Sequence, residues 1–180
     1  MNEKTKAVVT IGYHYGEIPW GKIVRNEYFS KNLIKNRNIT FYEIKNSNVK
    51  SGSICLDASF EVEKIIKKQN YQLWISIHCG FRKEKSKSLL SIPYFGYDKN
   101  IIEKAKKVKV IKVLPWEFMD ENERKAFDFG IPYTPIDALF YSRFQNRDTF
   151  EEMVNGVSTE NLENLLKGTL DAINIVYDLH

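Results

Sequence analysis

Two patterns of apolar and polar positions follow one another along this chain, and together they predict strands that alternate with helices. Short runs of β-branched and aromatic residues, bounded by glycine, proline or polar segments, indicate buried strands. Apolar residues that recur every three or four positions indicate amphipathic helices. The expected strands cover residues 7–11, 39–44, 71–80 and 108–114, and the expected helices cover residues 21–35, about 59–68 and 158–178.

The C-terminal helix has the strongest pattern in the sequence. Ser158 is placed to cap its first turn, and one face carries a continuous apolar stripe. The stripe consists of Leu162, Leu165, Leu166, Thr169, Leu170, Ile173 and Val176. We interpret it as a core-packing face. Residues 116–148 combine prolines with many aromatic side chains, and the pattern assigns them no element.

Alternation of strands with helices predicts βαβ units, and therefore a mostly parallel sheet covered on both faces. The sequence shows no internal repeat and no linker, so we expect one domain over residues 1–180. The expected fold class is α/β: a three-layer domain with a mixed, mostly parallel sheet and helices on both faces.

Composition and charge narrow the classes of protein to consider. The chain is 43% hydrophobic with a net charge of +4, as expected of a globular protein. Its densest basic stretch, residues 106–113 ("KKVKVIKV"), alternates like a strand with a lysine-lined edge, and we expect no nucleic-acid partner. No apolar run approaches a membrane-spanning length. Cys55 and Cys79 are too few for a disulfide framework, so we expect a cytoplasmic protein with reduced thiols.

Two of the three histidines lie where an α/β sheet places its ligand sites. His14 and Glu17 follow the first strand directly, and His78 lies at the carboxyl end of the strand "WISIHCG". Ligands of open α/β sheets bind beyond the carboxyl ends of the strands. Two imidazoles and a carboxylate can hold a zinc ion and leave a position for water. The structural alternative stays open: a loop histidine, a solvated glutamate and a hydrogen-bonded strand end.

Three short motifs resemble those of the zinc carboxypeptidase-like hydrolases, in particular short archaeal members of the succinylglutamate desuccinylase and aspartoacylase branch. They are "GYHYGE" near the N-terminus, "LWISIHCG" in the middle and "DTFEEM" before the last helix. The resemblance implies a phosphorylase/hydrolase-like fold with Zn²⁺ held by His14, Glu17 and His78. It also implies a zinc-dependent amidohydrolase or carboxypeptidase-like activity on an amide bond of a small acylated amino acid or peptide.

The same resemblance implies a general base that activates water, and it points to Glu151 on a strand-like Thr-Phe-Glu segment. On a strand, the neighbouring Glu152 would point to the opposite face. Glu117 in "LPWEF" also follows a predicted strand, and it stays a competing candidate.

The related enzymes act on substrates with a carboxylate, which an arginine fork binds well. The candidates are Arg143, which we favour, Arg147 and Arg82. The expected partner is accordingly a small-molecule or peptide substrate with a carboxylate, and the sequence does not indicate an oligomeric state.

Two other classes of function remain open. The N-terminal strand and turn and the segment "YQLWISIHCGF" also resemble the pyroglutamyl peptidases, which use a cysteine nucleophile with a histidine. Cys79 follows His78 directly, so on a strand the two side chains face opposite ways. The second half of the chain has no cysteine, and no histidine before His180. The other alternative is a catalytically inactive binding domain on the hydrolase fold.

Overall fold

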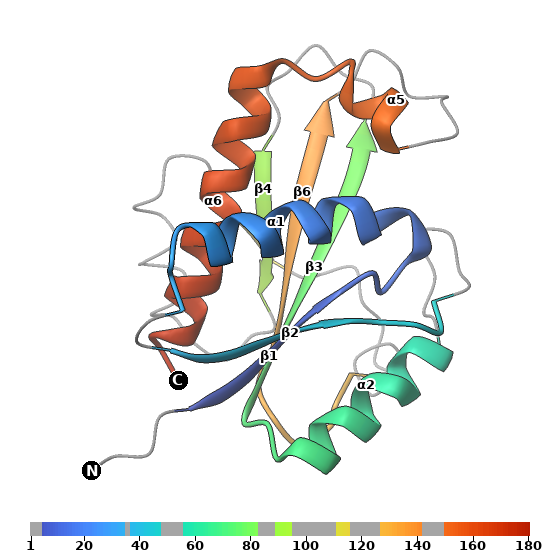
Figure 1. Ribbon diagram of the computed structural model, residues 1–180, viewed down its shortest axis with the longest axis vertical. Helices are drawn as coiled ribbons and strands as arrows, with labels where there is room; N and C mark the ends of the chain where they lie inside the picture. The colour runs from blue at the N-terminus through green and yellow to red at the C-terminus, as the bar shows by residue number, and fades with distance from the viewer. Residues whose placement is uncertain are drawn as a thin grey trace.

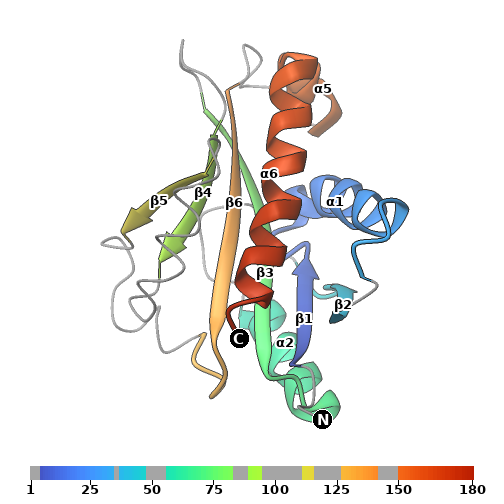
Figure 2. The same ribbon diagram turned by 90° about the vertical axis from the view of Figure 1, so that its left-hand side faces the viewer.

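A six-stranded sheet forms the centre of the structure, with strand order β2-β1-β3-β6-β4-β5 (Figures 1 and 2). The computed structural model describes residues 5–34, 37–47, 56–82, 89–94, 111–115, 127–141 and 150–180. The strands are β1 (Lys6–Ile11), β2 (Asn38–Glu43), β3 (Leu73–Arg82), β4 (Leu89–Tyr94), β5 (Ile111–Pro115) and β6 (Tyr133–Tyr141). The helices are α1 (Ile18–Ser30), α2 (Leu56–Gln69), α5 (Phe150–Val154), α6 (Thr159–Tyr177) and the short 3-10 helix η1 (Tyr15–Glu17).

The sheet is mixed and mostly parallel, which confirms the expected fold class. Strands β2, β1, β3 and β6 run parallel, β4 is antiparallel to β6, and β5 is parallel to β4. In the described residues no helix has the length and apolarity needed to cross a membrane.

Helices cover both faces of the sheet. Helices α1 and α6 contact each other and pack on one face, as Figure 2 shows (Trp20 and Val24 from α1; Leu165, Ile173 and Val176 from α6). Helix α2 packs on the opposite face, where Val62 and Ile66 lie in the cluster that contains Val8 and Trp74. The apolar stripe predicted for the C-terminal helix is therefore a core face, and the Ser158 hydroxyl caps that helix by accepting from the Asn161 amide.

Strands β4 and β6 lie where the sequence pattern predicted none. Pro135 is buried within β6 and pairs in register with Ser76, and Pro93 lies in β4. A proline lacks the amide that a strand ladder uses, so it argues against a strand in a sequence. Tertiary packing outweighs that local signal here, because β6 lies between β3 and β4 in the sheet.

Candidate metal centre

The register between the first and third strands brings the predicted ligands to one place. Strand β1 ends at Ile11, which is paired with Ile77 of β3. His78 is therefore the first residue of β3 beyond the end of β1. The chain leaves β1 through Gly12, whose φ of 80° few other residues adopt, and enters the turn that carries His14 and Glu17.

This place is also where the path of the chain changes direction. The connection from β1 through α1 leads to β2 on one side of β1, whereas β3 lies on its other side (Figure 1). At such a point the connecting segments diverge, and a crevice opens between neighbouring strand ends. The topology thus accounts for a ligand site between β1 and β3 without reference to any motif.

The three predicted ligands converge around the Glu17 carboxylate. Its Oε1 lies 3.0 Å from His14 Nδ1, and its Oε2 lies 3.1 Å from His78 Nδ1. One ligand atom from each of the three residues lies within 4.8 Å of the others. Zinc bonds of about 2.0–2.2 Å place neighbouring ligand atoms roughly 3 to 4 Å apart. The arrangement therefore fits a small divalent cation after a modest contraction.

Local structure fixes the position of Glu17. The backbone amide of Glu17 donates to the carbonyl of His14, which closes the 3-10 turn, and its Oε2 accepts from the His14 amide. Glu17 also occupies the N-cap position of α1, where the helix dipole favours a negative charge. Its side chain is 5% exposed, while the His14 and His78 side chains keep 13% and 12%. The carboxylate is thus held in place before any ion binds, and solvent reaches the imidazoles.

The electrostatics of the cluster favour an ionised carboxylate. Burial alone would raise the pKa of Glu17, but the His78 charge and the hydrogen bonds from His14 and His78 lower that pKa to about 2. Burial alone would lower the pKa of His78. The Glu17 carboxylate outweighs the effect of burial and raises the pKa of His78 to about 9. A buried carboxylate that needs a positive partner can take a metal cation in place of an imidazolium.

The other ring nitrogen of His78 faces away from Glu17. His78 Nε2 lies 2.7 Å from Ser76 Oγ, and Ser76 Oγ lies 2.7 Å from Tyr133 Oη. The Tyr133 ring lies against Trp74, with ring centroids 4.0 Å apart. Metal-binding histidines commonly have such a hydrogen-bond partner on the nitrogen that does not bind the metal. The sequence analysis did not single out the hydroxyls of Ser76 and Tyr133, because their proximity depends on β6, a strand that the sequence pattern did not predict.

A further carboxylate near the cluster was also missed. Asp137 of β6 is the register partner of His78, so both side chains project from the same face of the sheet. Its charge contributes to the raised pKa of His78. Asp137 lies in the proline-rich segment "IPYTPIDALF", to which the sequence pattern assigned no element. Finding Asp137 from the sequence would have required a correct assignment of β6.

The three glutamates considered for the general base have different outcomes in the structure. Glu151 is exposed on α5, which begins at Phe150, so the expected strand at this position is wrong. The described part of Glu152 is its backbone on the same helix, and Glu117 lies outside the described residues. The structure does not bring Glu151 into the cluster of His14, Glu17 and His78.

The side chains of the three predicted substrate-binding arginines lie outside the described part of the structure. Arg82 is the last residue of β3, four positions beyond His78, and its side chain is not described. Arg143 and Arg147 lie outside the described residues. Their role in binding a substrate carboxylate stays a prediction.

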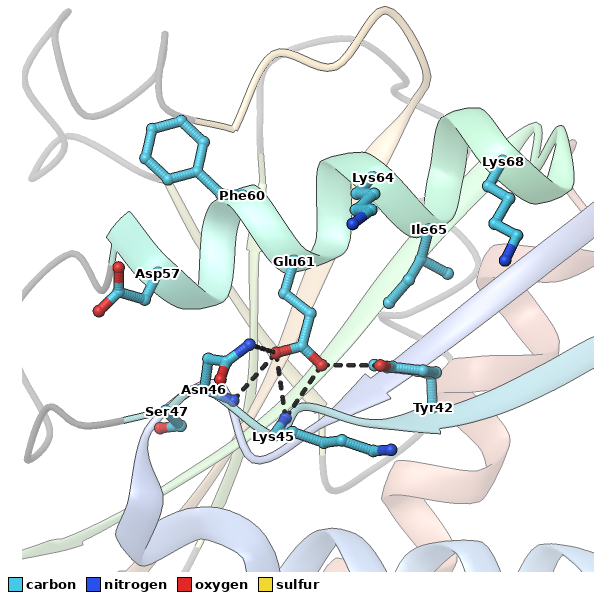
Figure 3. A pocket seen from close by; sticks show the side chains of 10 residues that line it. All are labelled: Tyr42, Lys45, Asn46, Ser47, Asp57, Phe60, Glu61, Lys64, Ile65 and Lys68. Atoms are coloured by element: carbon cyan, nitrogen blue, oxygen red, sulfur yellow. Dashed lines mark hydrogen bonds between the residues drawn. The ribbon is translucent and has the colours of Figure 1, made fainter.

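A second hollow, of about 770 Å³, lies between β2 and α2 (Figure 3). At its centre the Glu61 carboxylate accepts hydrogen bonds from Tyr42 Oη, the backbone amides of Lys45 and Asn46, and the Asn46 side chain. The carboxylate thus joins the end of β2 to α2. None of the described residues that line this hollow is a histidine, so they do not repeat the donor set of His14, Glu17 and His78.

The fold and the cluster together define an open α/β domain with a candidate metal centre at the carboxyl ends of its strands. No family model matches the sequence, and no curated protein matches it. Solved structures do match its fold. An MTA/SAH nucleosidase has a TM-score of 0.56 at 12% identity, with 97% of each chain covered.

Two further matches are an amidase and a carboxyl peptidase by name. The CwlD amidase from Clostridioides difficile, in complex with the GerS lipoprotein, has a TM-score of 0.54 at 10% identity, covering 98% of this chain and 100% of that chain. A mutant pyrrolidone carboxyl peptidase from P. furiosus has a TM-score of 0.53 at 12% identity, covering 98% and 97%. At such low identity these likenesses establish the fold alone.

The expected membership in the succinylglutamate desuccinylase and aspartoacylase branch is wrong. The matching structures include N-acetylmuramoyl-L-alanine amidases, nucleosidases and a pyrrolidone carboxyl peptidase. The resemblance depended on three short motifs, and a glycine-rich turn after a strand is common to many α/β folds. The third motif fails on structural grounds, because Phe150 and Glu151 begin a helix.

Proposed function

We propose that this protein is a metal-dependent hydrolase that cleaves an amide bond, with zinc as its metal. The observation that carries the proposal is the convergence of His14, Glu17 and His78 within 4.8 Å at the carboxyl ends of β1 and β3. Three protein ligands leave a coordination position for water and substrate, as catalytic zinc sites require.

The fold supports the class of reaction. Amidases and a pyrrolidone carboxyl peptidase share this architecture over nearly the whole chain. We therefore propose an amide bond of a small acylated amino acid or peptide as the bond that is cleaved. Nucleosidases share the fold as well, so the donor set at the strand ends, and not the fold, carries the choice of a metal-dependent reaction.

Each residue of the cluster has a defined task in this proposal. His14, Glu17 and His78 hold the cation, and Glu17 offsets part of its charge in a buried environment. A bound zinc ion supplies Lewis acidity toward a carbonyl oxygen and lowers the pKa of water. The chain must then provide a carboxylate outside the ligand set to move the proton to the leaving amine.

Asp137 and Glu151 are the two candidates for that proton-transfer role. Asp137 has the support of the structure, since it lies beside His78 on the neighbouring strand. Glu151 has the support of the sequence motif, and its exposure on α5 gives it no contact with the cluster in this structure. We favour Asp137 for this reason.

The proposal is tested with metal-loaded and metal-stripped protein on a panel of acylated amino acids and short peptides, with release of free amine as the readout. Turnover is expected from the loaded protein and should vanish on chelation and return with zinc. On a substrate found this way, Asp137→Asn should lower kcat about 100-fold or more while zinc stays bound, and Glu151→Gln should leave kcat unchanged. The reverse result would assign the base to Glu151. Stoichiometric zinc without turnover on any amide would favour a binding domain.

A pyroglutamyl-peptidase-like cysteine hydrolase has similar support from the fold. The geometry favours a metal-dependent reaction over cysteine chemistry. Cys79 belongs to the core on the α1 and α6 face, whereas His78 faces Glu17 and Ser76. Burial also raises the pKa of the Cys79 thiol well above its usual value, which disfavours the nucleophilic thiolate. Full activity in Cys79→Ala would exclude this thiol as the nucleophile; Cys55 lies outside the described residues.

A further inference from the structure

The two ring nitrogens of His78 have opposite surroundings, and this asymmetry carries a further inference. Nδ1 lies 3.1 Å and 3.3 Å from the two Glu17 oxygens, on the side of the candidate metal centre. Nε2 lies 2.7 Å from Ser76 Oγ, which is fully buried and lies two residues earlier on the same strand. The imidazole is thus held from both sides.

We propose that Ser76 and Tyr133 are positioning residues of the metal centre: Ser76 Oγ accepts the Nε2–H of His78, and this fixes Nδ1 as the atom that binds the metal. The inference rests on the proposed function, because it assumes that His78 is a ligand. A neutral imidazole that binds a metal through Nδ1 carries its proton on Nε2, and that proton needs an acceptor in a buried site.

Ser76 can serve as this acceptor because its own position is fixed. Its backbone lies within β3, paired in register with Pro135, and its hydroxyl lies 2.7 Å from Tyr133 Oη. The Tyr133 ring in turn packs against two aromatic rings, with centroids 4.0 Å from Trp74 and 5.3 Å from Phe127. The chain from Tyr133 through Ser76 to His78 therefore has little freedom to rotate.

Loss of the contact between Ser76 and His78 would let the imidazole rotate. Without an acceptor on Nε2, the buried Nε2–H would lose a hydrogen bond, and a ring rotation would relieve that loss at the expense of the Nδ1 position. Partners of this kind commonly change metal affinity by about 10- to 100-fold when they are removed. Tyr133 acts through Ser76, so its hydroxyl should matter less than that of Ser76.

The first test measures zinc affinity by competition with a chromophoric chelator in Ser76→Ala and Tyr133→Phe. We expect an affinity about 10- to 100-fold weaker for Ser76→Ala and a smaller loss for Tyr133→Phe. Tyr42→Phe is the matched control, since it removes a tyrosine hydroxyl that bonds Glu61 in the separate hollow between β2 and α2. That variant should bind zinc as the unchanged protein does.

The second test identifies which ring nitrogen of His78 binds the metal. A merely structural role of Ser76 would not affect this choice of atom. Protein loaded with ¹¹³Cd²⁺ and labelled with ¹⁵N should show metal coupling at His78 Nδ1 and a proton on Nε2. In Co²⁺-loaded protein, Ser76→Ala should change the visible spectrum, whereas Tyr42→Phe should not. Tyr133→Phe keeps the Ser76 hydroxyl, so it provides a result even if Ser76→Ala does not fold.

The outcomes separate this inference from the proposed function. Metal coupling at Nε2 of His78, or unchanged affinity and spectrum in both variants, overturns the inference and leaves the metal centre standing. Failure of the unchanged protein to bind Zn²⁺, Cd²⁺ or Co²⁺ overturns the proposed function and the inference with it.

Discussion

At the scale of single residues, Glu17 determines the chemistry of the candidate centre. Its carboxylate lies between two imidazoles, almost fully buried, with both oxygens at 3.0–3.1 Å from ring nitrogens. The proximity of His14, Glu17 and His78 could be predicted from the sequence, since it follows from where two strands end. Ser76, Tyr133 and Asp137 could not, because their proximity depends on the pairing of β3 with β6.

Glu17→Gln should change the protonation of its neighbour in metal-free protein. Burial lowers the pKa of His78, and the Glu17 charge, with a smaller contribution from Asp137, raises it to about 9. Removing the Glu17 charge leaves the effect of burial, which is the largest of these causes, against the smaller effect of Asp137. We expect the pKa of His78 to fall below its usual value near 6.5, measured by NMR titration of the imidazole after chelation. Glu43→Gln, which alters an exposed glutamate paired with Lys22, is the control. A pKa of His78 that stays near 9 would refute the assigned cause.

At the scale of elements, close contact between α1 and β1 sets the position of the ligand turn. A Cβ atom on Gly21 would lie 2.4 Å from Ile11 Cβ, so only glycine lets the helix approach the strand this closely. The helix begins one residue after Glu17, and a shift of α1 would therefore move this ligand.

Gly21→Ala should lower the free energy of unfolding by about 1–3 kcal/mol, because the added methyl group overpacks the contact with Ile11. Gly16→Ala is the matched control: a Cβ there meets nothing within 4 Å, and we expect a change of at most about 0.5 kcal/mol. Urea unfolding measures both. Equal stability of the two variants would show that the close approach does not constrain the helix.

The contact between α1 and α6 should give the fold a dependence on alkaline pH. Tyr28 Oη donates to Asn174 Oδ1, and burial raises the pKa of Tyr28 to about 12 from a usual value near 10. The neutral phenol is thus favoured in the folded state, so its contribution is complete below pH 10 and is lost as the pH rises to 12. Between pH 9 and 11 the unchanged protein should lose about 1 kcal/mol more stability than Tyr28→Phe. Parallel losses in the two proteins would contradict this.

The sequence predicted the elements whose periodicity is strong and local. The C-terminal helix and its Ser158 cap, the strands β1, β2 and β3, and the helix α2 follow from apolar spacing. Strand β6 was missed because Pro135 violates the local rule for strands, and α5 was expected as a strand from a motif. For β6, its place between β3 and β4 in the sheet outweighed the local proline signal.

At the scale of the whole molecule, the strand order explains the position of the candidate site better than the short sequence motifs do. The α/β class was correctly predicted, and the position of the cluster at the ends of β1 and β3 agrees with the order β2-β1-β3-β6, because ligands of such sheets bind where the strand order reverses. The family assignment was wrong: it depended on short motifs, whereas the structures that match over nearly the whole chain are amidases, nucleosidases and a peptidase. The matches to amidases, nucleosidases and a peptidase establish the architecture, and the side chains at the strand ends carry the proposed chemistry.

The central claim, a metal centre at these strand ends, is tested most directly by the zinc content of protein purified without chelator or added metal. The unchanged protein and His180→Ala should each hold about one zinc ion per chain, since His180 lies beside Thr5, at the opposite end of β1 from the site. His78→Ala should hold none while its circular dichroism stays that of the unchanged protein. Absence of zinc from the unchanged protein, or full zinc in a folded His78→Ala, would contradict the account.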